Sequence, residues 1–166
     1  MADEPQQPNP QPNQPHFQIE KIYVKDLSLE IPNAPQAFLE REAPTVDIQL
    51  HHNSQGVEDG IYQTVLTVTV TAKVADRTLF LVEAGQAGIF SIKNVPAAEL
   101  EAVLAIACPN ILFPYVREVV SDTVTRAGFP PVVLNPVNFE AIYQQSRDGQ
   151  PAAEPAPQII TPTISH

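Results

Sequence analysis

The sequence contains little of what several protein classes require. Its 166 residues include one cysteine, one methionine, no tryptophan and six glycines. A single cysteine excludes a disulfide within the chain and is typical of a reducing compartment. The chain does not open with a cationic segment and an apolar run, and we expect no run near the ~18 apolar residues of a membrane span. We therefore predict a cytoplasmic protein.

Basic residues are scarce as well. Nine Lys and Arg stand against nineteen Asp and Glu, which gives a formal net charge of −10 at pH 7. This surplus argues against nucleic acid and anionic lipid as partners, because both carry negative charge themselves. It favours solubility and the attraction of cationic partners.

Apolar residues are almost absent from both ends of the chain. Residues 1–15 are rich in Pro, Gln and Asn, and residues 149–166 in Pro, Ala and Gln with isolated isoleucines. Neither stretch can bury enough apolar surface to offset the entropy lost on ordering, so we expect two disordered tails. Residues 16–148 have a common domain size and predict a single domain.

The first half of this domain predicts strands. Alternation over 16–31 breaks twice, which indicates bulges or a strong bend, with two short strands joined at Lys25-Asp26 as the alternative. Residues 45–51 alternate cleanly, and 53–60 predict a polar turn. Residues 61–72 have one apolar and one Thr-rich face, which is typical of an antiparallel sheet covered on one side.

A fourth strand is expected over residues 78–92, and it is apolar on both faces. Leu79 and Leu81 share one face, while Phe80, Val82 and Ala84 share the other. Beside a one-sided neighbour, such a strand indicates a second packing partner such as another subunit.

The second half predicts helices. One begins at Pro96, and the apolar spacing of three and four over 116–124 predicts helix again. Pro109 and Pro114 leave two possibilities: one long kinked helix, or a new helix that begins after Pro114. Gly128 predicts its end. Asn138 predicts the N-cap of a short C-terminal helix, whose apolar face would hold Phe139, Ile142 and Tyr143. The expected class is α+β, with a four-stranded antiparallel sheet followed by a long, kinked helix and this short one.

Two large apolar residues, Phe38 and Leu39, fall in the loop between the first two strands. They either attach the loop to the core, which we favour from the residues alone, or offer a binding surface.

Candidate catalytic and metal-binding residues do not form a recognisable constellation. His51 and His52 are adjacent, so on a strand they point to opposite faces and cannot share a metal; we expect both to be exposed. Cys108 lacks a flanking metal or nucleophile motif and predicts a buried thiol. No phosphate-binding loop or catalytic triad context is present. We predict a protein that is not an enzyme and that uses no metal or cofactor.

Several blocks, in order and at compatible spacing, resemble the SecB family of bacterial protein-export chaperones. They are Ile22-Tyr-Val-Lys-Asp26, Pro32-Asn-Ala-Pro35, Thr67-Val-Thr-Val-Thr71, Gln86-Ala-Gly-Ile-Phe-Ser-Ile92, Cys108-Pro-Asn-Ile-Leu-Phe-Pro-Tyr115, Gly128-Phe-Pro-Pro131 and Asn135-Pro-Val-Asn-Phe139. The resemblance implies an ATP-independent holdase that keeps secretory precursors unfolded and delivers them to SecA, the translocation motor. It also implies a homotetramer, a dimer of dimers with helices between the sheets.

By position, the resemblance implies three sets of site residues. The grooves for unfolded clients would be lined by Phe38, Leu39, Val46, Ile48, Leu50, Phe139, Ile142 and Tyr143. The acidic sheet surface that docks on SecA would comprise Asp26, Glu30, Leu81 and Glu83. The contact between dimers would include Val82, Ala84 and Gln86.

Three alternatives stay open. A SecB-like chaperone dedicated to one client, such as an antitoxin, would bind neither SecA nor generic precursors. A small hydrolase or isomerase would need a convergent acid–base pair. A purely structural oligomer would bury Phe38, Leu39 and Phe139.

Overall fold

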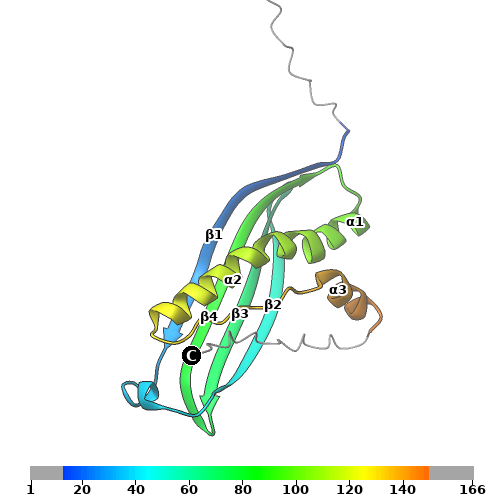
Figure 1. The fold of residues 1–166 in the computed structure, drawn as a ribbon. Helices are drawn as coiled ribbons and strands as arrows, with labels where there is room; N and C mark the ends of the chain where they lie inside the picture. The colour runs from blue at the N-terminus through cyan, green and yellow to red at the C-terminus, as the bar shows by residue number, and fades with distance from the viewer. Residues whose placement is uncertain (1–12, 150–166) are drawn as a thin grey trace, which may run out of the picture.

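The computed structural model describes residues 13–149, which form a four-stranded antiparallel sheet with helices on one face (Figure 1). The strands lie in the order β1-β4-β3-β2 and comprise β1 (His16–Glu30), β2 (Thr45–Glu58), β3 (Ile61–Val74) and β4 (Arg77–Lys93). The α+β prediction, with strands first and helices after them, is confirmed. Residues 1–12 and 150–166, which hold most of the two predicted tails, lie outside the described residues.

Strand β1 is long and twice bulged. Its register against β4 shifts between Ile19 and Lys21 and again between Val24 and Asp26. Each shift adds one residue and restores the apolar side chains to the same face. The predicted bulges are therefore confirmed, and the alternative of two short strands is wrong, because one strand continues through both positions.

Because β1 and β2 lie at opposite edges, the chain between them crosses one end of the sheet. This crossing loop, residues 31–44, contains the short 3-10 helix η1 (Gln36–Leu39) and passes the turn that joins β3 to β4 (Figure 1). The crossing places Phe38 and Leu39, which belong to this loop, at the end of the sheet where β4 begins.

Strand β2 extends further than predicted. The expected polar turn over 53–60 is wrong, because Asn53 and Ser54 still pair with Val65 and Thr64 on β3. The Ser54 and Thr64 hydroxyls share a hydrogen bond of 2.7 Å, so polar side chains are satisfied within the sheet. The chain reverses only at Gly60, whose φ of +70° suits glycine.

The helical layer is one continuous run through both prolines. It consists of α1 (Ala97–Ala102), a π-helical turn η2 (Val103–Ala107) and α2 (Cys108–Arg126). Of the two possibilities, the long helix is correct. The wide π turn directly precedes Pro109, and the carbonyl of Leu104, five residues before this proline, accepts a 3.4 Å hydrogen bond from the Ser54 hydroxyl.

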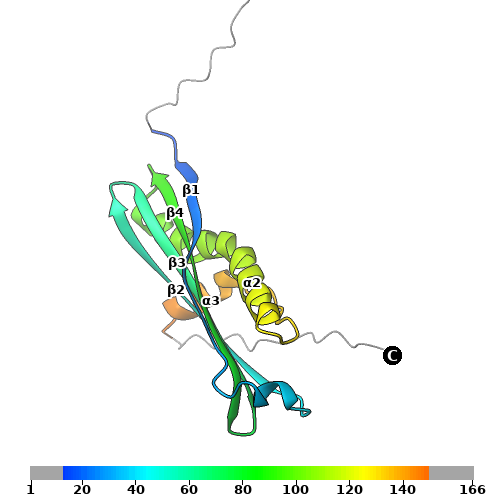
Figure 2. The same ribbon diagram turned by 90° about the vertical axis from the view of Figure 1, so that its left-hand side faces the viewer.

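Helix α2 packs along one face of the sheet (Figure 2). Its buried side chains repeat at helical spacing, as predicted, and rest on β3 and β4; they include Leu112, Val116, Val120 and Val124. The approach is close at Gly88, where a Cβ atom would lie only 3.0 Å from Cδ2 of Leu112. The predicted end is confirmed too, since Gly128 follows α2 with φ +91°.

The run Ala97–Arg126 is long and apolar enough to cross a membrane, with a mean hydropathy of 1.5 over its best window. The prediction that no such run exists is therefore wrong by length and composition. Only 33% of that window is buried inside the chain. The core helix of a soluble protein meets the same criterion, and here one face of the run packs against β3 and β4.

Strand β4 departs from the predicted faces at its start. The register against β3 shifts between Ala72, which pairs with Phe80, and Lys73, which pairs with Thr78, so Leu79 is the extra residue. Leu79 and Phe80 are both buried and line the same cavity. The prediction that Leu79 shares a face with Leu81 is wrong because this bulge changes the alternation.

The short helix α3 (Phe139–Arg147) begins as predicted. The side chain of Asn138 accepts a hydrogen bond of 3.0 Å from the N–H of Ala141. Phe139 and Tyr143 are buried and Ile142 is half-buried, so the predicted apolar face is confirmed.

Candidate functional site: an apolar groove at the sheet end and an acidic outer face

An apolar groove of about 360 Å³ lies at the end of the sheet that the crossing loop spans. The loop forms one wall, the start of β4 with Val46 forms the floor, and the segment after α2 forms the other wall. The lining comprises Ala37, Phe38, Glu40, Glu42, Pro44, Val46, Leu79, Phe80, Gly128, Phe129, Pro130, Pro131 and Val132.

Three aromatic rings connect the walls to the floor. The Phe38 and Phe129 rings stack with centroids 5.0 Å apart, and the Phe80 and Phe129 centroids are 4.8 Å apart. Gly128 makes this contact possible, since its φ is +91° and a Cβ would lie 3.1 Å from Cε1 of Phe38. The turn after α2 thus requires glycine for its backbone and for the ring beside it.

The crossing loop exposes large apolar side chains beside this groove. Phe38 is 48% exposed and Leu39 is 77% exposed, although Ala37 between them and the core is buried. The two sequence-based alternatives therefore both apply to Phe38, whose ring is stacked on one side and open on the other. Of the three side chains that a purely structural oligomer would bury, Phe139 is buried within this chain, whereas Phe38 and Leu39 are exposed.

The other predicted client-binding residues lie deeper. Val46 lines the groove, Leu50 is half-buried, and Ile48 is buried beneath the helical layer. They share the face of β2 that turns toward the helices, as the alternation predicts.

Phe139 is a core residue in this structure, with 1% of its surface exposed. Its ring meets those of Phe113 and His52 edge-on, at centroid distances of 6.2 and 6.3 Å. Burial, and then the charge of His51, lower the pKa of His52. The expectation that both histidines are exposed holds for His51 and is wrong for His52, because α3 covers it.

The structure brings the four predicted SecA-docking residues together on the outer face of the sheet, opposite α2. On the paired strands β1 and β4, Glu30 lies opposite Leu81, Ser28 opposite Glu83, and Asp26 opposite Gly85. Glu30 and Glu83 therefore flank Leu81, and Asp26 extends the acidic surface along β1 beyond Glu83. The hydroxyl of Thr69 donates a 3.0 Å hydrogen bond to Oε2 of Glu83, which orients that carboxylate.

The predicted interface residues of β4 are buried within their own chain. Val82, Ala84 and Gln86 are each at most 3% exposed, because the strand alternation turns them toward α2. Oε1 of Gln86 has no hydrogen-bond partner among the described residues. A contact between subunits in this region would have to use neighbouring side chains or require α2 to move.

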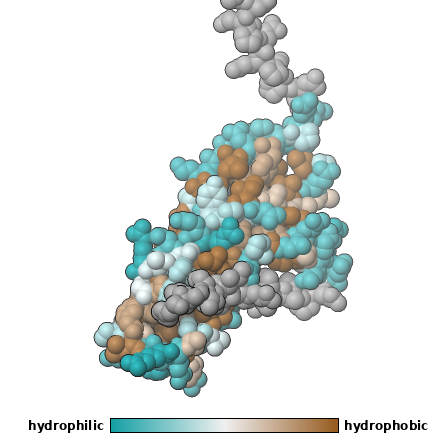
Figure 3. Space-filling view, viewed as in Figure 1, coloured by the Kyte–Doolittle hydropathy of each residue, from teal (hydrophilic) through white to brown (hydrophobic). Residues whose placement is uncertain are grey.

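A row of exposed apolar side chains follows the edge strand β1, on the face that carries the helices. Its members are 39 to 50% exposed and comprise Phe17, Ile19, Val24, Leu27 and Leu29. Figure 3 shows apolar surface over this side of the molecule and again at its lower end, by the crossing loop. The sequence analysis missed this row, although the alternation that shifts at each bulge could have indicated it.

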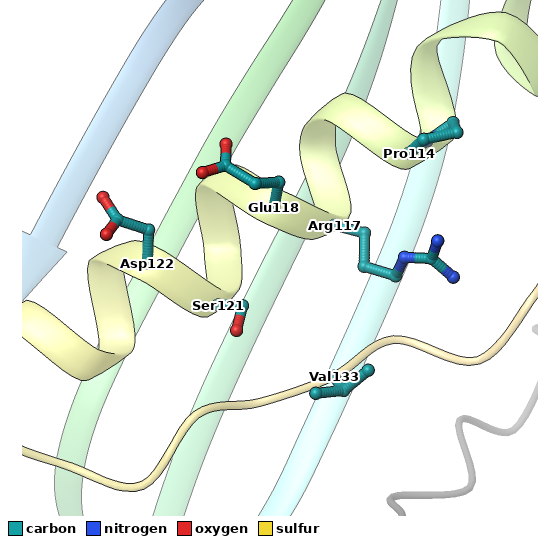
Figure 4. Close-up of a pocket in the computed structure, with 6 residues that line it drawn as sticks. All are labelled: Pro114, Arg117, Glu118, Ser121, Asp122 and Val133. Atoms are coloured by element: carbon teal, nitrogen blue, oxygen red, sulfur yellow. The ribbon is translucent and has the colours of Figure 1, made fainter.

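A second cavity, of about 400 Å³, lies between α2 and the segment that follows it (Figure 4). It is lined by Pro114, Arg117, Glu118, Ser121, Asp122 and Val133. None of these residues belongs to a predicted site.

Groups suited to acid–base, nucleophilic or metal chemistry do not gather in the described part of the chain. Burial raises the pKa of the Cys108 thiol to about 12, so it is a protonated core side chain, as predicted. Among residues 13–149 no group of three or more His, Cys, Asp or Glu could hold a metal ion.

Comparison with known proteins fits this architecture. Residues 10–150 match the family model of SecB, described as preprotein translocase subunit SecB. The protein-export protein SecB of Nitrosospira multiformis is 62% identical over 100% of both chains. That of Methylobacillus flagellatus is 60% identical over 94% of this chain and 98% of the relative.

Among solved structures, a SecB-like chaperone of Mycobacterium tuberculosis, in complex with a peptide from the HigA1 antitoxin, has a similar fold. Its TM-score is 0.61 at 20% sequence identity, covering 74% of this chain and 91% of that one. At this identity the likeness concerns the fold alone. The family model and the relatives at about 60% identity, over nearly the whole chain, show that this protein belongs to the SecB family of protein-export chaperones.

Proposed function

We propose that this protein is an ATP-independent holdase of the cytoplasm, which keeps secretory precursors unfolded and delivers them to SecA. The observation that carries the proposal is the open apolar groove beside Phe38, in a chain of the SecB family. Unfolded clients expose apolar side chains, and folding buries them, so the groove would select for the unfolded state.

Client binding would begin at the exposed side chains of Phe38 and Leu39 and continue into the groove at Val46. Ile48 and Leu50 follow Val46 on the same face of β2 and would extend the client path beyond the groove. Phe139, Ile142 and Tyr143 lie further along, where Phe139 packs on His52 and Phe113, and they would contact a client directly only if α3 moved away. The protein would act by binding and release, without catalysis.

Delivery would use the outer face of the sheet. Glu30 and Glu83 place negative charge on either side of Leu81, and Asp26 extends it along β1, which suits a basic partner surface with an apolar contact. Because this face lies opposite the helical layer, SecA could dock while a client remains bound.

The working form would be a homotetramer, a dimer of dimers. The exposed apolar row on the edge strand β1 and the apolar surface of the run Ala97–Arg126 favour association with further copies. Several grooves on one particle would raise the affinity for a long client while each contact stays exchangeable.

Mixing the purified chain with an unfolded, slowly refolding protein, and separately with its native form, tests the proposal. Size-exclusion chromatography with light scattering, without ATP, should give a particle of four chains that retains only the unfolded form. A particle that binds neither form would refute the holdase. A particle that holds unfolded clients but does not bind purified SecA would instead support a chaperone dedicated to another task; the close relatives, named as protein-export proteins, favour export.

A further inference from the structure

The crossing loop is tied to the β3–β4 hairpin by two polar contacts. Nη2 of Arg77 donates to Oε2 of Glu40, and Nδ2 of Asn33 donates to the carbonyl of Thr78 over 2.8 Å. Both hairpin residues lie at the start of β4, just before Phe80, which forms part of the groove floor. These contacts therefore fix the loop wall relative to the floor.

The carboxylate of Glu40 also organises the loop itself. Its Oε1 accepts hydrogen bonds from the backbone N–H groups of Arg41 and Glu42, over 3.0 and 3.2 Å. These two bonds, and then Arg77, lower the pKa of Glu40, so the group stays ionised at neutral pH. One side chain thus holds the turn after η1 and joins it to the hairpin.

We propose that the Glu40–Arg77 ion pair is a positioning device for client binding, which holds the crossing loop as a fixed wall of the apolar groove and so slows client release. This inference rests on the proposed holdase function. Phe38, Glu40 and Glu42 all line the groove from the loop, so its width follows the loop's position. Arg77 does not line the groove and acts only through Glu40.

The expected effect is local. The Arg77 side chain is 62% exposed and the Glu40 side chain 15%, and an ion pair with one solvated partner adds little to global stability. Loops open at far lower free energy than whole domains, so a small contribution can still change how often this wall is in place. If the loop is already ordered before a client binds, binding does not have to include the loss of conformational entropy that ordering the loop would cause.

The substitution Arg77→Gln isolates this effect because it leaves every groove-lining residue unchanged. The probe is a dye-labelled, permanently unfolded polypeptide, released from the full-length protein by an excess of unlabelled polypeptide. We expect release about threefold faster than from the wild type, with the same melting temperature within about a degree. Amide exchange over residues 36–42 should also become faster.

The pair can be tested for coupling. Glu40→Gln keeps an oxygen that can accept from the loop backbone but loses the charge, and should speed release to a similar extent. The double variant should release no faster than either single one, because each removes the same interaction. Additive effects would show that the two residues act separately and would overturn the proposal.

The matched control is Asp122→Asn. It removes the exposed ion pair of Asp122 with Arg126 on α2, 2.7 Å long, and lies outside the apolar groove. We expect unchanged release. The inference would be overturned if Arg77→Gln released the polypeptide as slowly as the wild type does. It would also be overturned if Asp122→Asn released it as fast as Arg77→Gln. A wild type that never retains the polypeptide would refute the holdase function itself.

Discussion

The Phe38 ring, on the crossing loop, stacks on the Phe129 ring, which follows α2, with 5.0 Å between centroids. This contact closes one end of the groove and joins two segments that are far apart in the sequence. Because Phe38 is also 48% exposed, its outer side remains available to an apolar side chain of a client. One ring can therefore build the groove and bind in it.

Substituting Phe38 by alanine should weaken client binding. A client would cover about half of the ring, and losing that contact should reduce the free energy of binding by about 1 kcal/mol. This corresponds to a dissociation constant that is roughly fivefold higher. Fluorescence titration of a dye-labelled unfolded polypeptide would measure it. Val57→Ala is the control, since Val57 is 54% exposed but lies outside the groove. Equal losses from both variants would show that the effect is not specific to this site.

Substituting Phe139 by alanine should act on stability instead. The ring is fully buried against Phe113 and His52, and Phe to Ala changes in cores cost about 3–5 kcal/mol. Thermal unfolding should show a drop of several degrees, while client affinity measured well below the transition stays the same. Weaker binding at an unchanged melting temperature would instead place Phe139 on the client surface.

Local patterns predicted much of the fold because each reports directly on burial. The apolar face of β3 and the helical spacing at Val116, Val120 and Val124 come out as expected, since one side of each element is covered and the other is not. Even the bulges of β1 were visible as two breaks in alternation.

The errors arose where tertiary structure overrides local preference. Asn53 and Ser54 resemble turn residues, yet they stay in β2 because β3 supplies their partners. The bulge at Leu79 changes which face the side chain occupies, and no single-strand pattern shows it. Pro109 directly follows a π turn, and Pro114 lies inside α2 without ending it, so neither proline marks a helix boundary here.

The candidate site divides in the same way. Period-two alternation is enough to place Asp26, Glu30 and Glu83 on one face once the strands are paired. Whether Phe139 is exposed depends on how α3 folds back over β2, which its own sequence does not specify. An apolar helix face is compatible with a core and with a binding surface alike.

The apolar row of β1 predicts how copies associate. Leu27, at 50%, is the most exposed member of the row, and a carboxylate there would have to lose its water in any contact between subunits. Leu27→Asp should shift the mass found by light scattering from four chains to a smaller species. Lys25→Asp, on the same strand but outside the row, is the control. An unchanged tetramer in Leu27→Asp would exclude this edge from the interface.

Reversing the charge of Glu83 should separate delivery from holding. Glu83 is exposed on the outer face, opposite the groove, and its carboxylate is oriented by Thr69. In Glu83→Lys we expect affinity for purified SecA to fall roughly tenfold or more, because a cation would then meet a basic partner surface. The affinity for an unfolded polypeptide should stay the same. Thr69→Val, which removes only the orienting hydroxyl, should weaken SecA binding to a smaller extent.

Glu58→Lys changes the charge equally at the end of β2 and should leave SecA binding intact. If Glu58→Lys weakened docking as much as Glu83→Lys, the total charge rather than this surface would attract SecA. If Glu83→Lys lost client and SecA binding together, the two functions would not reside on opposite faces of the sheet.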